Sequence, residues 1–284
     1  MIILDGKSLA EQKKIQLKAR VSAFRSKYGR VPRLAVILVG DDPASQIYVR
    51  SKLKACESVG VSSAEYILAQ ATTPNGVSEL IQELNEDDST DGILLQLPLP
   101  RELDSLELIS QIDPKKDVDC LTSENIGKLV LGTYFIGPCT PAGILSLLDH
   151  YQIDCDGKYA VVLGRSQIVG KPIAQMLSQR NATVTLCHSK TKNLKEFTKQ
   201  ADILIVAVGQ RNLIGKDDVK KGVVVIDVGM NREESKKLVG DVNQDELKDV
   251  AFAMTPVPGG VGPMTIITLL ENTMTLAELR KAQK

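Results

Sequence analysis

Residues 159–172 read Tyr159-Ala160-Val161-Val162-Leu163-Gly164-Arg165-Ser166-Gln167-Ile168-Val169-Gly170-Lys171-Pro172 and indicate a nucleotide-binding fold. The apolar run predicts a buried strand, and Pro172 suits the first turn of a helix. A dinucleotide-binding fold places the phosphates at such a junction of strand, turn and helix. Ser166 stands where the usual glycine pattern has its second glycine. The order of the elements therefore supports this interpretation more than the glycines do, and an ordinary α/β turn is the alternative.

Apolar runs alternate with helical patterns on both sides of this turn. The expected elements are strands 34–39, 64–69, 92–97, 159–163, 183–186, 203–206 and 223–228, and helices 44–59, 76–84, 171–180, 193–199 and 265–281. This rhythm predicts two α/β domains, the second a Rossmann-like doubly wound parallel sheet, with an active-site cleft between them. Prolines near Pro138 mark the boundary. We therefore predict a first domain of residues 1–138 plus 264–284, onto which the last helix packs back, and a second of residues 139–263.

Composition favours small-molecule chemistry. The 284 residues carry 35 basic and 35 acidic side chains, so no overall charge attracts nucleic acid or an anionic membrane. The chain begins without a signal-peptide pattern and contains no apolar run long enough to cross a membrane, so a cytoplasmic protein is expected. Five scattered cysteines indicate reduced thiols, and with only two histidines we predict no metal site.

The residues after the second strand of the nucleotide-binding unit indicate which nucleotide binds. An NAD site commonly ends that strand with an acidic residue on the ribose, whereas this chain continues with His188-Ser189-Lys190. These groups, together with Arg165, favour a ribose 2′-phosphate through charge-assisted hydrogen bonds, with a solvated loop as the alternative. The sequence thus predicts NADP. Two later strands end at Gly209 and at Gly229-Met230, where bare backbone could approach a nicotinamide.

The first unit offers a second group of candidate residues. Tyr48 and Lys52 lie four residues apart in the predicted helix 44–59 and therefore on one face, although an ordinary surface pair has the same spacing. Gln96 interrupts an apolar strand, where a buried amide is costly unless it has a partner. Because ligands of open α/β folds bind beyond the carboxyl ends of the strands, these side chains are expected to meet there.

Residues 255–265 place three prolines and three glycines before an apolar helix. Proline stiffens the backbone and glycine lets it approach a ligand closely, so the segment predicts either a ligand-binding loop or a rigid connector.

Taken together, several segments resemble the bifunctional methylenetetrahydrofolate dehydrogenase/methenyltetrahydrofolate cyclohydrolase family. They are Ser45…Tyr48…Lys52, Asp91-Gly92…Gln96-Leu97-Pro98-Leu99-Pro100, Lys116-Asp117-Val118-Asp119, Pro138-Cys139-Thr140-Pro141, Gly164-Arg165-Ser166…Val169-Gly170 and Pro256 to Thr265. The resemblance spans nearly the whole chain in order. It implies oxidation of 5,10-methylenetetrahydrofolate by NADP, hydrolysis of the methenyl product to 10-formyltetrahydrofolate, and a homodimer.

The resemblance also assigns roles to individual residues. Lys52 is expected to move the proton in the hydrolysis, Gln96 to hold Lys52, Tyr48 to border the ring system, and Asp119 to accept from the pterin. The expected substrate-binding residues are Tyr48, Lys52, Gln96, Asp119, Gly259, Gly260, Gly262 and Pro263. The expected cofactor-binding residues are Gly164, Arg165, Ser166, Val169, Gly170, His188, Ser189, Gly209, Gly229 and Met230.

One position departs from the family pattern, which usually has glycine where this chain has Cys120. If the backbone there needs a positive φ, a side chain strains that backbone and affects the orientation of the Asp119 carboxylate. A dehydrogenase without the hydrolytic step is therefore one alternative function. A non-catalytic NADP-binding module is another.

Overall fold

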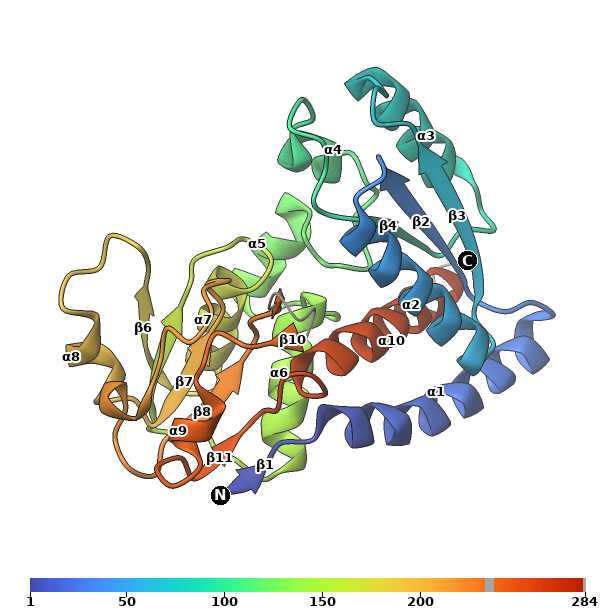
Figure 1. Ribbon diagram of the computed structural model, residues 1–284. Coiled ribbons are helices and arrows are strands. Elements are labelled where there is room, and N and C mark those ends of the chain that lie inside the picture. Colours follow the sequence, from blue (N-terminus) through green and yellow to red (C-terminus); the bar gives the residue numbers. More distant parts are fainter. Residues whose placement is uncertain (233–237, 283–284) are drawn as a thin grey trace. The chain divides into compact units, whose positions relative to one another are not determined.

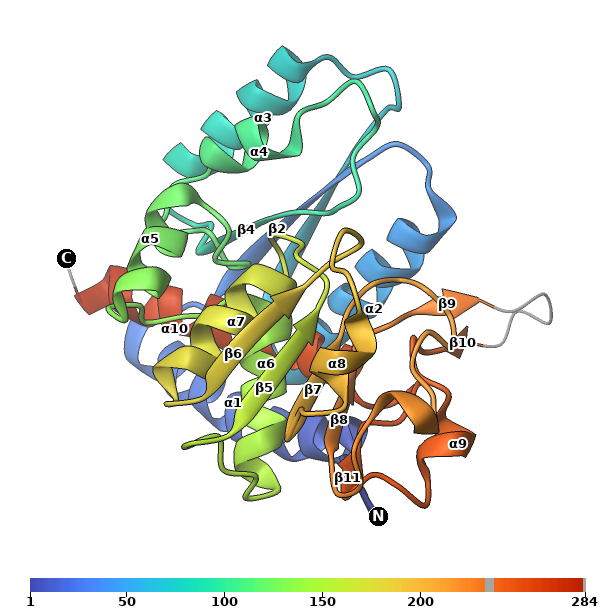
Figure 2. The same ribbon diagram turned by 90° about the vertical axis from the view of Figure 1, so that its left-hand side faces the viewer.

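The computed structural model describes residues 1–232 and 238–282, and Figures 1 and 2 show its ribbon from two sides. The chain forms two compact units. The six-strand unit comprises Met1–Glu11 and Thr140–Thr265, and the three-strand unit comprises Gln12–Cys139 and Ile266–Lys284. The later boundaries lie within two residues of the predicted ones.

The first eleven residues, however, belong to the six-strand unit and not to the predicted first domain. The reason is the short strand β1 (Ile2–Ile3), which pairs in parallel with β11 (Ala253–Met254). A strand of two residues is too short to show a period of two in the sequence.

The sheet of the six-strand unit is parallel, with the order β1-β11-β8-β7-β5-β6 among the described residues. Its other strands are β5 (Tyr159–Leu163), β6 (Thr183–Cys187), β7 (Ile203–Val206) and β8 (Val224–Asp227). From β5 the chain adds β6 on one side and β7 on the other, so the strand order reverses between β5 and β7. Doubly wound folds bind ligands at such a switch point. The predicted α/β class and doubly wound sheet are confirmed.

The remaining elements of this unit connect the strands. They are helices α6 (Cys139–His150), α7 (Gly170–Gln179), α8 (Leu194–Thr198) and α9 (Gln244–Leu247), the 3-10 turn η1 (Lys216–Asp218), and an antiparallel pair of strands β9 (Asn231–Arg232) and β10 (Leu238–Val239).

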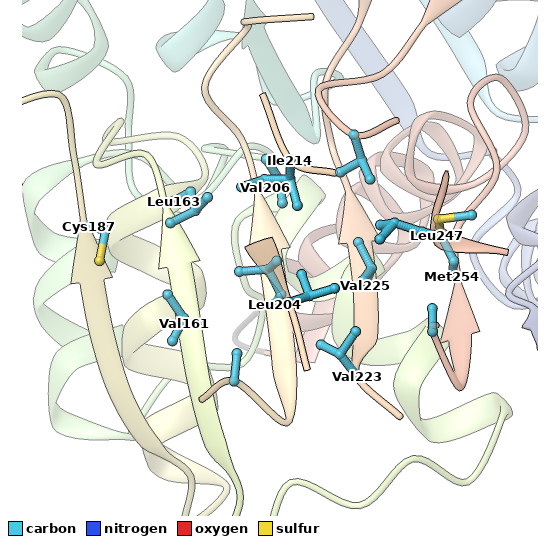
Figure 3. Close-up of a cluster of buried hydrophobic side chains, with 14 residues drawn as sticks. Val161, Leu163, Cys187, Leu204, Val206, Ile214, Val223, Val225, Leu247 and Met254 are labelled. Carbon is cyan, nitrogen blue, oxygen red and sulfur yellow. The ribbon is translucent and has the colours of Figure 1, made fainter. Parts of the chain in front are cut away.

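Apolar side chains from successive strands make the core of this unit (Figure 3). Residues two apart on a strand point to the same face, so Val161 and Leu163 of β5 pack with Leu204 and Val206 of β7. β7 and β8 are buried along their whole length, as expected for central strands of a covered parallel sheet.

The three-strand unit has the parallel order β3-β2-β4. Its strands are β2 (Arg33–Val39), β3 (Ser62–Leu68) and β4 (Gly92–Leu95). The helices are α2 (Pro43–Val59), α3 (Pro74–Glu86), α4 (Ser105–Ser110), α5 (Ser123–Leu131) and most of α1 (Gly6–Tyr28) and α10 (Val261–Ala282). The predicted packing of the last helix on this unit is confirmed.

Two boundaries differ from the predictions in ways that matter for function. β4 ends at Leu95, so Gln96 lies just beyond the strand, where prolines follow that cannot continue the sheet. α10 begins at Val261, because Pro263 is compatible with a first helical turn. No helix in the described parts of the chain is long and apolar enough to cross a membrane.

Candidate active site and cofactor site

Lys52 and Gln96 are brought together as predicted. Asp42 caps the start of α2 by accepting a hydrogen bond from the Ser45 amide at 2.7 Å. Two turns along this helix, the Lys52 Nζ donates to the Gln96 Oε1 at 2.9 Å. Gln96 is nearly buried, with its side-chain amide donating to the Leu97 carbonyl. Because that amide nitrogen is occupied, the amide oxygen faces the ammonium, which has only donors to offer.

Tyr48 lies one turn before Lys52 on α2, with 37% of its surface exposed. A partly exposed ring on the helix that carries the lysine suits contact with a flat ligand.

Asp119 follows a segment that runs alongside β4. The Ile93 amide donates to the Lys116 carbonyl at 2.7 Å, and Ile93 forms a parallel bridge with Asp117. The next residue after Asp119 is Cys120, which has a φ of 57°. The positive φ considered for this position is therefore present, and a residue with a buried thiol takes the strained conformation.

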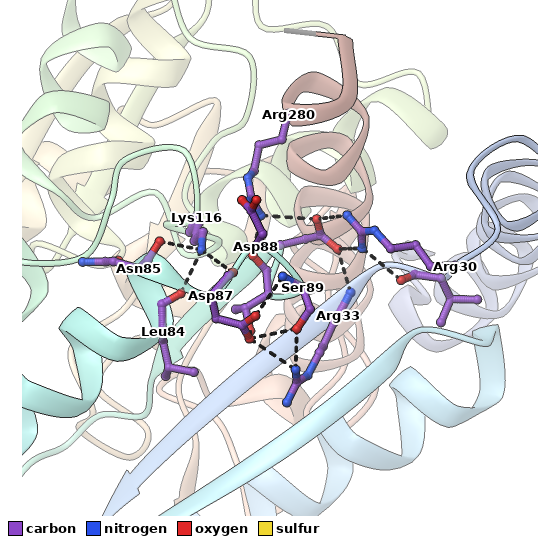
Figure 4. Close-up of polar contacts among 12 residues, drawn as sticks. Arg30, Arg33, Leu84, Asn85, Asp87, Asp88, Ser89, Lys116 and Arg280 are labelled. Atoms are coloured by element: carbon purple, nitrogen blue, oxygen red, sulfur yellow. Dashed lines mark hydrogen bonds and ion pairs between the residues drawn. The ribbon is translucent and has the colours of Figure 1, made fainter. Parts of the chain in front are cut away.

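Polar groups pin the segment on the amino-terminal side of Asp119. Lys116 is 1% exposed, and its Nζ donates to the carbonyls of Leu84, Asn85 and Asp87 at 2.8, 2.7 and 2.8 Å (Figure 4). These carbonyls lie at the end of α3, which has no later turn to satisfy them.

Asp117 is also buried, and its carboxylate accepts from the Thr122 amide at 2.8 Å and from the Asn125 side chain at 2.9 Å. Asp119 thus projects from a backbone that is held on both sides.

A buried thiol connects the surroundings of Asp119 and Lys52. Burial and the Asp119 carboxylate, which also makes a hydrogen bond with it, raise the pKa of Cys139 well above its usual range, while the Lys52 ammonium opposes that rise. Asn272 of α10 donates to the Val118 carbonyl at 2.8 Å and lies 3.6 Å from the Cys139 sulfur. Asn272 was not singled out from the sequence, because its partners lie far away along the chain.

The turn after β5 contains two glycines that lie in close contact with neighbouring backbone. Gly164 has a φ of +107°, and a Cβ there would lie 2.1 Å from the Ala207 carbonyl oxygen. A Cβ on Gly170 would lie 2.0 Å from the Gly164 carbonyl oxygen. Ser166 Oγ accepts from the Val169 and Gly170 amides at 3.2 and 3.3 Å, so it caps the start of α7. Both glycines are required whatever the ligand.

The loop after β6 is a tight turn without an acidic residue. The Thr191 hydroxyl accepts from the His188 amide at 2.9 Å, and His188 Nδ1 accepts from the Lys190 amide at 3.2 Å. Ser189 and Arg165 are exposed. The arrangement suits an anion better than a ribose diol that needs a carboxylate.

Gly209, with a φ of +66°, and Gly229 follow the adjacent strands β7 and β8. Met230 is 41% exposed. Sequence reasoning missed the two buried carboxylates that hold these loops, Asp227 and Asp241. Asp227 could have been noticed in the sequence, because it is an acidic residue at the end of an apolar strand.

The glycine-rich segment is shorter as a loop than predicted. Gly259 has a φ of +108°, its carbonyl accepts from the Lys7 amide at 2.8 Å, and the Gly260 amide donates to the Pro256 carbonyl at 2.9 Å. Gly262 and Pro263 already lie in the first turn of α10. The segment belongs to the six-strand unit, whereas Tyr48, Lys52, Gln96 and Asp119 belong to the three-strand unit.

Comparison with known proteins identifies the family. Family models for the catalytic domain and the NAD(P)-binding domain of tetrahydrofolate dehydrogenase/cyclohydrolase match residues 4–119 and 138–281. The chain belongs to the tetrahydrofolate dehydrogenase/cyclohydrolase family.

Relatives of this family match along the whole chain. The bifunctional protein FolD of Acetivibrio thermocellus is 51% identical over 282 residues, which cover 99% of each chain, and that of Bdellovibrio bacteriovorus is 50% identical over 281 residues. The crystal structure of FolD from Campylobacter jejuni has a TM-score of 0.96 at 51% identity, covering 99% of both chains. The Trypanosoma brucei enzyme, solved with NADP and an inhibitor, has a TM-score of 0.96 at 36% identity, covering 100% of this chain and 99% of that one.

The family membership confirms the predicted enzyme class, namely a bifunctional dehydrogenase and cyclohydrolase that acts on tetrahydrofolate derivatives and has an NAD(P)-binding domain. The assignment of individual residues to substrate and cofactor stays a prediction.

Proposed function

We propose that this tetrahydrofolate dehydrogenase/cyclohydrolase oxidises 5,10-methylenetetrahydrofolate with NADP and then hydrolyses the product through Lys52 and Gln96. The observation that carries the proposal is the 2.9 Å hydrogen bond between the Lys52 Nζ and the Gln96 Oε1, since it joins the two residues to which the resemblance assigns the hydrolytic step. Tyr48 and Asp119 complete the substrate residues in the same unit.

The chain's own residues contribute mainly alignment to the first step. NADP, when bound, accepts a hydride from the methylene carbon, which leaves a methenyl cation. Two flanking nitrogens of the substrate stabilise that cation, so the protein has to hold donor and acceptor in line. A carboxylate at Asp119 accepts from the ring N–H and amino group of the pterin, and Tyr48 borders its ring.

The second step requires proton transfer. Water adds to the methenyl carbon, one C–N bond breaks, and a proton leaves as 10-formyltetrahydrofolate forms. Lys52 moves that proton at its Nζ, and Gln96 keeps the Nζ pointing at the reacting carbon.

NADP fits the residues of the six-strand unit. The turn after β5 lies where doubly wound folds bind the phosphates, and Arg165, His188 and Ser189 receive the ribose 2′-phosphate. Support comes from the strand order, which reverses between β5 and β7, and from the absence of an acidic residue among residues 187–191.

The test of the central proposal is Lys52→Met, with Lys54→Met as the matched control because Lys54 is exposed on the same helix. The reduced cofactor, the methenyl chromophore and the formyl product are followed separately. We expect Lys52→Met to lose cyclohydrolase activity by about 10²-fold or more and Lys54→Met to keep it. An unchanged cyclohydrolase rate in Lys52→Met removes Lys52 from the mechanism.

The enzyme is also proposed to act in the cytoplasm as a homodimer. The dimer is supported by the family resemblance, and the location by an odd set of scattered cysteines. Light scattering that gives the mass of a single chain, or recovery of the enzyme outside the cytoplasmic fraction, contradicts these two proposals respectively.

A further inference from the structure

Two buried carboxylates lie beneath the loops that follow β7 and β8. Asp227 is the last residue of β8 and is 1% exposed. Asp241 follows β10 and is 0% exposed. Burying carboxylates costs several kcal/mol each, so their placement calls for a specific purpose.

The Asp241 carboxylate joins two loops. Its Oδ2 accepts from the amides of Val208 and Gly209 at 2.8 and 3.0 Å. Its Oδ1 accepts from the side chain of Asn231 at 2.9 Å. One carboxylate thus ties the loop after β7 to the start of β9, which continues from the loop after β8.

The Asp227 carboxylate holds Asp241 in turn. Its Oδ1 accepts from the Gly229 and Asp241 amides, both at 2.9 Å, and its Oδ2 accepts from the Val242 amide at 3.1 Å. The two aspartates form what we call the carboxylate clamp.

Two glycines make room for the clamp. A Cβ on Gly229 would lie 2.4 Å from the Asp241 Cγ, and a Cβ on Gly240 would lie 1.7 Å from the Asp227 Oδ2. Because both distances are far below van der Waals contact, each carboxylate lies directly against bare backbone, and the clamp tolerates little displacement.

The outer side of the clamped loops is open. Val208 is 37% exposed and Met230 is 41% exposed, whereas the carboxylates beneath them are buried. These loops follow the carboxyl ends of two adjacent parallel strands, where doubly wound folds bind their ligands. The clamp therefore fixes a surface from below and leaves its upper side available.

We propose that Asp227 and Asp241 are positioning residues that hold the loops 208–209 and 228–230 against the nicotinamide end of NADP, and that they serve hydride transfer but not hydrolysis. The inference rests on the proposed cofactor site. A loop that carries the ring must be held to a fraction of an ångström, because a misplacement of about 1 Å can cost about 10²-fold in rate.

Asp241→Asn is the first test. It preserves the shape of the side chain but replaces one oxygen, which accepts a hydrogen bond, by an NH₂ group that faces an N–H donor. Asp245→Asn, with a side chain 88% exposed in the same unit, is the matched control. We expect Asp241→Asn to lower dehydrogenase kcat/KM by about 10²-fold, while cyclohydrolase turnover and the affinity for 2′,5′-ADP stay within about twofold. The fragment 2′,5′-ADP reports only on the adenosine end.

Gly240→Ala provides a second test that leaves both carboxylates in place and displaces Asp227. It should show the same separation of the two activities, and it decides the matter if Asp241→Asn does not fold. Full dehydrogenase activity in either folded variant overturns the inference, and so does an equal fall in dehydrogenase and cyclohydrolase rates. If the wild-type enzyme does not bind 2′,5′-ADP, that result contradicts the proposed cofactor site instead.

Discussion

The Lys116 ammonium donates three hydrogen bonds to backbone carbonyls at the end of α3. Replacing Lys116 by Met removes this charged donor. The ammonium is 1% exposed and donates to the carbonyls of Leu84, Asn85 and Asp87 within 2.8 Å (Figure 4). Methionine has a similar length and an apolar stem, so it fills the same space. It cannot donate, however, and leaves the helix carbonyls without these partners.

The size of the effect follows from opposing contributions. Hydrogen bonds to a charged group contribute about 1.5–3 kcal/mol each. Against their loss stands the relief of several kcal/mol of ammonium desolvation, which is also the reason that burial lowers the pKa of Lys116. Each buried carbonyl that is left without a partner costs about 1–3 kcal/mol, so three of them, partly offset by that relief, give a net loss of about 4 kcal/mol. With a urea dependence of about 2 kcal/mol per molar, the unfolding midpoint should fall by roughly 2 M.

Lys115→Met is the control, because Lys115 is the exposed neighbour in sequence. The chain contains no tryptophan, so unfolding in urea is followed by far-UV circular dichroism. Hydrogen exchange of the amides around residues 84–87 reports locally on the end of α3. Equal urea midpoints and equal exchange for Lys115→Met and Lys116→Met refute the reasoning, since the three bonds then contribute nothing that water cannot replace.

Three further predictions concern other parts of the chain. Burial, and then the neighbouring Asp241, raise the pKa of Asp227 to about 6, so the folded state holds more protons than the unfolded state between pH values of about 4 and 6. The stability that this proton contributes is present below that window and lost as the pH rises through it; the dependence should be missing in Asp227→Asn when urea midpoints are compared across pH. Cys120→Gly relieves a positive φ worth about 1–2 kcal/mol but loses a buried side chain, so its melting temperature should stay close to that of the wild type, whereas Cys120→Val should melt clearly lower. Arg165→Ala should raise the KM for NADP by about tenfold and leave that for NAD unchanged, and equal effects on both contradict a role at the 2′-phosphate.

Periodic segments could be predicted closely from the sequence. The strands Tyr159–Leu163 and Ile203–Val206 have the predicted bounds, because continuous apolar runs between turn residues leave little choice. β1 escaped prediction because it has only two residues. The start of α10 was placed too late because Pro263 suits a rigid loop and a first helical turn equally well.

The parts of the candidate site that depend on contacts between two side chains could be predicted from the sequence. Lys52 and Gln96 each stand out by residue type, and the fold brings them together at 2.9 Å. Asp227, Asp241 and Lys116 did not stand out in the same way, because their partners are mostly backbone groups 14 to 33 residues away. Examples are the Val208 amide for Asp241 and the Leu84 carbonyl for Lys116. Every residue offers a backbone carbonyl and every residue but proline an amide, so no pattern in the sequence marks the group that is used.

This difference has a consequence for the loops that follow the strands. Apolar periodicity determines where β7 and β8 lie, but it says nothing about the residues beyond their ends. The backbone amides of those residues have no neighbouring strand that accepts their hydrogen bonds. A buried carboxylate supplies several acceptor positions at once and can hold amides from separate loops, as Asp241 does for Val208 and Gly209. An apolar side chain in the same place could fill the space but would leave those amides unsatisfied. The hydrogen bonds to the loop amides therefore offset the cost of burying the charge. They also fix the positions of the loops, and hydride transfer requires such fixed positions.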